Sequence, residues 1–148
     1  MMRLSIPAFV TIVLVGAAAA IGASAPATFT PAGMAWVAGT GTAKGTSQVI
    51  LVGHPDKTGT AVIRVKMPDG YVNQPHYHAT AEYITVIQGA LLFGTGDTVD
   101  KATATLLPAG SFIEVPAGVH HWSVTKGITI EQVDGEAPLN NIPIKHSM

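Results

Sequence analysis

The sequence predicts an all-β domain, an antiparallel sandwich or barrel, behind an N-terminal export signal. After residue 27, short runs rich in β-branched residues recur at roughly 8–12-residue spacing, which is typical of such folds. Gly, Pro and Asp separate these runs, and no stretch of the mature chain keeps a helical period of apolar residues. A length of 148 residues fits one domain. We therefore expect a single-domain β-barrel.

The N-terminus has the three parts of a secretory signal peptide: a positive start at residues 1–3, an apolar stretch over 4–20 and a small-residue region over 21–27. Cleavage after Ala23 or Ala27 is favoured over cleavage after Ala25, because Pro26 is a poor residue just after a cut. The alternative is an uncleaved membrane anchor, but the apolar run falls just below the ~20 residues that a spanning helix needs. We predict export to the periplasm or secretion, with no membrane contact after cleavage.

The predicted strands lie between residues 34 and 133: Met34–Ala38, Gln48–Val52, Ala61–Met67, Glu82–Gln88, Ala90–Phe93, Thr103–Leu107, Ser111–Val115, His121–Thr125 and Ile128–Val133. In the third run, Ala, Ile, Val and Met alternate with Val, Arg and Lys, which marks a half-buried strand. We expect an N-terminal arm over 28–45, the barrel over 46–137 and a C-terminal tail over 138–148. The tail is expected to lie along the outside of the barrel or to fray.

Composition excludes several classes of protein. The chain is 47% hydrophobic and 11% charged, so it is not a disordered chain, and its formal net charge of -1 with no Lys/Arg run argues against nucleic-acid binding. The absence of Cys excludes disulfides, thiolate metal sites and Cys nucleophiles. Neither a phosphate-binding Gly-x-x-x-x-Gly-Lys loop nor a Gly-x-Ser-x-Gly nucleophile turn is present.

The histidines are the most informative residues. His76 and His78 are two apart, so an extended chain places both imidazoles on one face. Glu82 follows at the start of the next apolar run, and a third imidazole is available from His120 or His121. Three neutral imidazole nitrogens and one carboxylate can hold a divalent metal and leave positions free for water or a ligand.

Two segments resemble the conserved motifs of the cupin superfamily: Gly70-(five residues)-His76-Tyr77-His78-(three residues)-Glu82-(six residues)-Gly89, and Gly110-(five residues)-Pro116-Ala117-Gly118-(two residues)-His121. The first matches its motif in every position, and the register of the second selects His121 rather than His120 as the third imidazole. The Asn that usually lies four residues beyond is replaced here by Thr125.

The resemblance implies a cupin-type jelly-roll barrel with one divalent transition metal (Fe, Mn, Ni, Zn or Cu) held by His76, His78, Glu82 and His121. The chain is most similar to small exported single-domain cupins, for which no reaction is generally established. Three functions are compatible with it: a metal-dependent oxygenase, isomerase or lyase acting on a small organic molecule, a non-catalytic binder of a small ligand, and a barrel stabilised by its metal. Open metal positions disfavour the last, because structural sites are usually closed.

Strand parity predicts the walls of the cavity. If Glu82 faces inward, so do Ile84, Val86 and Gln88, and if His121 faces inward, so do Ser123 and Thr125. Parity places no catalytic base in the cavity besides the metal ligands. Glu114 either lines the cavity or is solvated.

The remaining aromatic and histidine side chains are expected outside the site. Trp122 and Tyr83 face outward, covered either by a second subunit, since cupins commonly form homodimers, or by the arm or tail. We expect His120 on the barrel surface, opposite His121, with a role beside the metal as the alternative. His54, in a turn, and His146, in the tail, are expected not to bind metal.

Overall fold

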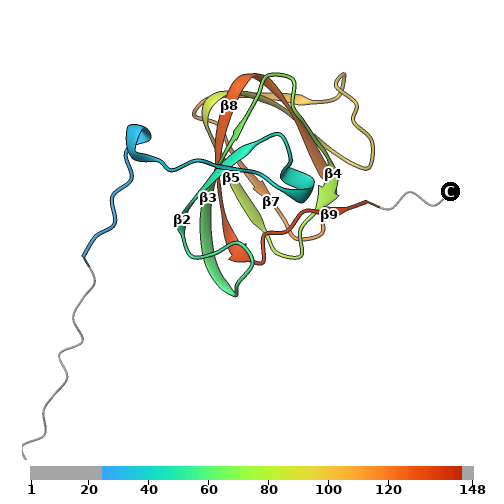
Figure 1. The fold of residues 1–148 in the computed structure, drawn as a ribbon. Coiled ribbons are helices and arrows are strands. Elements are labelled where there is room, and N and C mark those ends of the chain that lie inside the picture. Colours follow the sequence, from blue (N-terminus) through green and yellow to red (C-terminus); the bar gives the residue numbers. More distant parts are fainter. Residues whose placement is uncertain (1–24, 145–148) are drawn as a thin grey trace, which may run out of the picture.

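The computed structural model describes residues 25–144 (Figure 1). The predicted signal peptide up to residue 24, with the cleavage position after Ala23, and His146 in the tail lie outside the described residues. The elements are the 3-10 turns η1 (Pro31–Gly33) and η2 (Gly41–Ala43) and the strands β1 (Val37–Ala38), β2 (Ser47–Val52), β3 (Gly59–Met67), β4 (Val72–Tyr77), β5 (Glu82–Thr95), β6 (Thr105–Pro108), β7 (Phe112–Val115), β8 (His121–Ala137) and β9 (Ile142–Pro143). Between residues 25 and 144, no helix has the length and apolarity that crossing a membrane requires.

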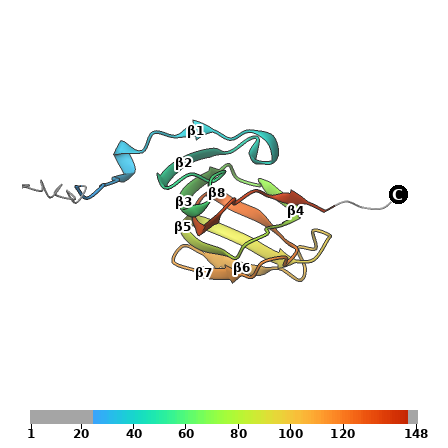
Figure 2. The ribbon, with the colours of Figure 1, turned by 90° about the horizontal axis from the view of Figure 1, so that it is seen from below.

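All strand pairings are antiparallel, and together they form one curled sheet with the order β1-β2-β3-β8-β4-β9. The long β8 connects its parts, since one edge pairs with β3 and β4 and the other edge with β5. β5 also pairs with β6 and β7. Figure 2 shows β1 and β2 on one side of the barrel and β6 and β7 on the opposite side. The all-β jelly-roll prediction is confirmed.

Two pairs of predicted strands are continuous in the structure. The runs ending at Gln88 and starting at Ala90 merge into β5, and the runs on both sides of Gly127 merge into β8. The register between β5 and β8 shifts between Val86 and Gln88 and again between Gln88 and Ala90, so these strands bend without ending. The prediction that Gln88 faces the cavity is wrong, because the first shift turns this side chain out to solvent.

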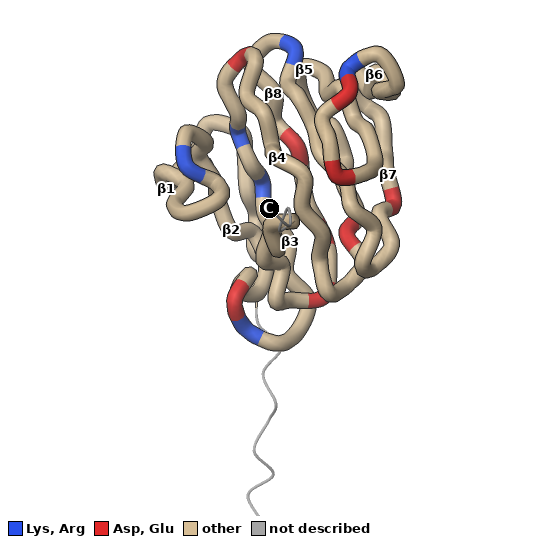
Figure 3. The backbone as a smooth tube through the Cα atoms, turned by 90° about the vertical axis from the view of Figure 1, so that its right-hand side faces the viewer, with Lys and Arg blue, Asp and Glu red and all other residues tan. Residues whose placement is uncertain are grey.

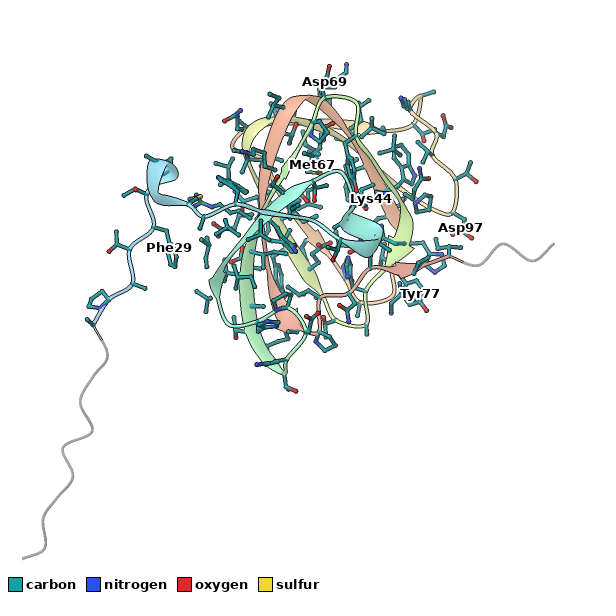
Figure 4. The ribbon with its side chains drawn as sticks, in the orientation of Figure 1. Phe29, Lys44, Met67, Asp69, Tyr77 and Asp97 are labelled. Atoms are coloured by element: carbon teal, nitrogen blue, oxygen red, sulfur yellow. The ribbon has the colours of Figure 1, made fainter. Side chains whose placement is uncertain are left out.

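The core lies inside the curled sheet and follows the predicted alternation of β3, in which Ala61, Ile63 and Met67 are buried. The larger of two apolar clusters consists of Ala61, Ile63, Ile84, Val115, Val133, Ala137 and Leu139, and the smaller of Met67, Val86 and Leu91. Figure 4 shows Met67 within the barrel and Phe29 far out on the N-terminal segment. Lys and Arg are scattered singly over the strands and loops in Figure 3, in agreement with the absence of a basic run in the sequence.

Trp122 and Tyr83 differ in their surroundings. The prediction that Trp122 needs a second subunit as cover is wrong, because its side chain is fully buried within one chain and packs against Gly94, directly opposite on β5. A Cβ on Gly94 would overlap the indole, so glycine makes this packing possible. Tyr83 does face outward, 38% exposed, and stacks on exposed Phe112 with ring centroids 6.4 Å apart.

The tail packs closely against the barrel, where an outer or frayed position was expected. Leu139 is buried in the core, and β9 pairs with the end of β4. The N-terminal arm also reaches the barrel, since Tyr71 donates a hydrogen bond from its hydroxyl to the carbonyl of Thr42 at 3.3 Å, and Lys66 lies over the ring of Trp36. Arm and tail therefore both contact the barrel.

Candidate metal centre and cavity

Three buried histidines meet inside the barrel. His76 lies at the end of β4, His78 just beyond it, and His121 at the start of β8, in direct register with His76. Their candidate ligand atoms all lie within 4.8 Å of one another, and each residue is 3% exposed. Three buried histidines this close together could hold a metal ion.

Each of the three rings is oriented by a backbone carbonyl. The Nδ1–H of His76 donates to Gln74 at 2.7 Å, that of His78 to Asn140 at 3.2 Å, and that of His121 to Val119 at 3.0 Å. A carbonyl only accepts, so in each ring the proton sits on Nδ1 and the Nε2 lone pair is free. This is the outer-shell arrangement that fixes metal-binding histidines. The sequence required such acceptors but did not identify them.

Glu82, the first residue of β5, completes the group. Its Oε2 lies 3.4 Å from Nε2 of His78 and 3.3 Å from Nε2 of His121, and it is buried. Neither Oε2 nor Nε2 of His78 has a hydrogen-bond partner among the described residues. Lone-pair nitrogens facing a carboxylate oxygen repel it unless a cation lies between them, so the donor set fits a divalent metal.

The pKa values of Glu82 and His76 favour the protonation states that bind a metal ion. Burial tends to raise the pKa of Glu82, but hydrogen bonds and positive charge from His121 and His78, where their Nε2 atoms carry protons, outweigh burial and lower the pKa to about 2. A metal ion in the place of these protons would stabilise the carboxylate in the same way. Burial, together with the neighbouring His121, lowers the pKa of His76 to about 4. Near neutral pH, Glu82 is thus ionised and His76 neutral, which are the forms that bind metal.

The low pKa of His76 predicts acid sensitivity of the metal-free protein. Because the folded state disfavours the protonated ring, this stability is fully present above the unfolded pKa of 6.5 and is lost as the pH falls towards 4. We expect a loss of about 3 kcal/mol from this residue. Urea unfolding of the metal-free protein at pH 4 and pH 7, compared with His76→Gln, measures it. An equal pH dependence in the variant would contradict the assignment.

The other described histidines lie outside the group. His120, next to His121, points the opposite way: its Nδ1 lies 2.6 Å from Oδ1 of Asp97, and its ring stacks on Tyr77. Figure 4 shows Tyr77 and Asp97 on the same side of the barrel. His54 is exposed in the loop between β2 and β3, where its Nδ1 accepts a hydrogen bond from the backbone N–H of Asp56. Both placements agree with the surface positions expected from the sequence.

Thr125, at the position usually taken by Asn, has a structural role. Its hydroxyl donates to the carbonyl of Pro68 at 2.6 Å and accepts from the backbone N–H of Tyr71 at 2.8 Å, which ties β8 to the turn before β4. It is buried, and so is Ser123, but neither lines the cavity described below, so the prediction that they form its wall is wrong.

Thr125→Val is expected to destabilise the protein by about 1 kcal/mol, because the isosteric methyl removes both hydrogen bonds of the hydroxyl, whereas the backbone N–H of Tyr71 keeps the carbonyl of Pro68 as an acceptor at 3.3 Å. Thermal or urea unfolding measures the change, and Thr125→Ser, which keeps the hydroxyl, is the control. A loss in Thr125→Ser with no loss in Thr125→Val would show that the methyl, and not the hydrogen bonds, matters.

A cavity of about 270 Å³ opens beside the histidines, and Glu82 forms part of its wall. Its described lining is mostly polar but contains no Lys or Arg: Thr40, Thr42, Ala43, Thr46, Gln48, Pro55, Asp56, Ile63, Val65, Met67, Tyr71, Asn73, Glu82, Glu131, Val133, Leu139, Asn140 and Asn141. The arm supplies three of these residues, Thr40, Thr42 and Ala43, and the tail three between 139 and 141. The two segments treated as peripheral in the sequence therefore shape the site.

Sequence reasoning missed a second buried acid in this cavity. Glu131, on β8, lines the cavity, and burial, together with the charge of Glu82, raises its pKa to about 8. Glu131 and Val133 are two residues apart and share one face of the strand, which was the available signal. Ile128 and Ile130 lie on the opposite face, so the sequence did not show which face is buried. Glu114, the acid considered instead, is exposed on β7.

Comparisons with known proteins agree with this fold. Residues 31–144 match the family model described as a domain of unknown function, DUF4437. A germin-like protein (subfamily 3 member 2) of Arabidopsis thaliana is 29% identical over 70 residues, which cover 47% of this chain and 31% of that protein. The matched region thus spans about a third of that relative.

Two solved structures show the same architecture. The polyketide cyclase RemF of Streptomyces resistomycificus aligns with a TM-score of 0.64 and 18% identity, covering 83% of this chain and 88% of that one. An RmlC-like cupin of Shewanella frigidimarina aligns with a TM-score of 0.58 and 15% identity, covering 76% and 91%. The family match over most of the barrel and these likenesses lead to one conclusion: the chain belongs to the DUF4437 family and has the fold of these cupin structures.

Proposed function

We propose that this protein binds one divalent transition metal through His76, His78, His121 and Glu82. The observation that carries the proposal is the set of three Nε2 lone pairs, each fixed by a carbonyl on Nδ1, beside an unpartnered carboxylate oxygen. Imidazole and carboxylate ligands suit Fe, Mn, Ni, Zn and Cu alike, so the donor set does not select among them.

The function best supported is a metal-dependent enzyme acting on a small organic molecule, of the oxygenase, isomerase or lyase type. A metal at this site would act as a Lewis acid on a bound oxygen atom or activate water. Glu82 lies between the histidines and the cavity, so a molecule in the cavity could reach the metal. The likeness to a structure described as a polyketide cyclase agrees with an enzymatic role but does not transfer its reaction.

A non-catalytic binder of a small ligand is the second candidate. The amides of Asn73, Asn140, Asn141 and Gln48 on the cavity wall favour it, because neutral donors and acceptors suit the recognition of polar ligands. Oxygen consumption and proton-exchange assays on the metal-loaded protein separate the two functions. A ligand that binds and is recovered unchanged would support the binder.

Equilibrium dialysis of the metal-free protein against Mn, Fe, Ni, Zn or Cu tests the metal site. We expect one equivalent to bind to the wild type and markedly less to Glu82→Gln, with Glu114→Gln, on the barrel surface, as the matched control. Normal metal binding by Glu82→Gln would remove Glu82 from the ligand set. Loss of metal with an unchanged melting temperature would exclude a purely stabilising role of the metal.

Export and self-association are further parts of the proposal. The N-terminal pattern of the sequence supports transfer to the periplasm or outside, and mass spectrometry of the exported protein should find residues 1–27, or a slightly shorter signal, removed. The exposed stack of Tyr83 and Phe112 supports a homodimer that buries it. Light scattering should give a dimer for the wild type and a monomer for Tyr83→Ser with Phe112→Ser; a monomeric wild type would contradict the dimer.

A further inference from the structure

The position of Glu131 is unusual for a carboxyl group. It lies in the middle of β8, paired with Val65 of β3 on one side and Val86 of β5 on the other. It is 7% exposed, and no hydrogen bond or cation among the described residues offsets the burial of its carboxyl group. Such groups are rarely buried without a partner. The titratable groups that share the cavity with it are Glu82, Tyr71 and Asp56, none of which is a cation.

The strand register places Glu131 and Glu82, which contacts the histidines, at separate positions along the cavity wall. Glu82 pairs with Gly135, and Val86, four residues further along β5, pairs with Glu131. At ~3.3 Å per residue, the Cα atoms of the two acids are roughly 13 Å apart, with both side chains on the cavity wall. Between them, Ile63 and Val133 pair directly and both line the cavity. The cavity therefore has two acidic ends and an apolar stretch between them.

The absence of a nearby positive charge determines the protonation state of Glu131. Without a nearby cation, the neutral carboxylic acid is favoured, and the raised pKa of Glu131, about 8, agrees with this. A neutral carboxyl group offers an O–H donor, whereas a carboxylate only accepts. The end of the cavity away from the histidines thus presents a hydrogen-bond donor to whatever fills it.

We propose that Glu131 contacts the ligand or substrate as a neutral carboxylic acid, and that the cavity takes a short molecule with one oxygen near the histidine cluster, an apolar middle and a second, hydrogen-bond-accepting oxygen at Glu131. Residues Ile63 and Val133 face the apolar middle. This inference rests on the proposed function for the first oxygen only, because the contact with Glu131 does not involve the metal.

The test combines deletion of an oxygen in the ligand with deletion of the acid. Binding of 4-hydroxybutan-2-one and of butan-2-one, which lacks the hydroxyl, is measured by NMR titration with wild type, Glu131→Leu and Glu131→Gln. We expect the hydroxyl to strengthen binding about tenfold in the wild type and in the Gln variant, whose amide also donates, and not at all in the Leu variant. An equal effect of the hydroxyl in all three proteins, or no binding of either probe, would overturn the inference.

A second measurement determines the protonation state of Glu131 directly. Infrared spectra at pH 7 should contain the carbonyl band of a protonated carboxylic acid in the wild type and in the surface control Glu114→Gln, and this band should be missing in Glu131→Gln. A band unaffected by Glu131→Gln would show that Glu131 is ionised. Both experiments are run with and without zinc. Failure to bind zinc would contradict the proposed metal site alone. Zinc binding without the effect of the hydroxyl would contradict only the proposed role of Glu131.

Discussion

Replacing His121 by Ala is expected to weaken metal binding by more than about 100-fold, because even residues that only orient a metal ligand contribute 10–100-fold. The variant removes one of three lone pairs and leaves Oε2 of Glu82 facing His78 alone. The affinity is measured by competition with a chromogenic chelator at neutral pH.

The adjacent residue provides the matched control. His120→Ala removes an imidazole of the same strand end, but this ring contacts Asp97 and Tyr77 on the other side of the backbone. We expect its metal affinity to stay within about threefold of the wild type. Equal losses in the two variants would mean that local unfolding, and not ligation, explains the effect of His121→Ala.

The second large effect concerns Glu131 and pH in the metal-free protein. The folded-state pKa of about 8 lies above the ordinary value of 4.5, so the folded state holds the proton more tightly than the unfolded state. Below pH 4.5, Glu131 is protonated in both states and its ionisation does not lower the free energy of unfolding. As the pH rises from 4.5 towards 8, the unfolded state ionises first and the free energy of unfolding decreases. We expect the stability advantage of Glu131→Gln over the wild type to increase by about 3 kcal/mol between pH 5 and pH 8.

Urea unfolding of both proteins at the two pH values gives this difference, and the histidine titrations cancel in the comparison. Glu114→Gln, at an exposed position, should show no such trend. A constant difference between Glu131→Gln and the wild type would mean that Glu131 is ionised throughout the range, which contradicts both the raised pKa and the ligand contact inferred above.

The sequence predicted the fold class and the histidine cluster because both depend on short-range patterns. The alternation in β3 and the spacing of His76 and His78 require only that the chain be extended. The choice between His120 and His121 came from the motif register, and the structure places His121 with the other two.

The errors have a common physical cause. Alternation along a strand mispredicts which side chains are buried where the strand bends or where residues distant in the sequence pack against it. The register shift after Val86 turned Gln88 outward, and Gly94 allowed Trp122 to be buried within one chain. The acceptor for His78 is the carbonyl of Asn140, a backbone group that side-chain patterns do not reveal. Glu131 was missed because burial of an acid depends on three-dimensional neighbours that its own strand does not encode.

The metal content of the protein is the most direct test of the central claim. The untagged protein is purified at neutral pH, and its metals are determined by elemental analysis. The account predicts about one equivalent of Fe, Mn, Ni, Zn or Cu in the wild type and in His120→Ala, and little in His121→Ala. No metal in the wild type, even after reconstitution with each of these ions, would contradict it.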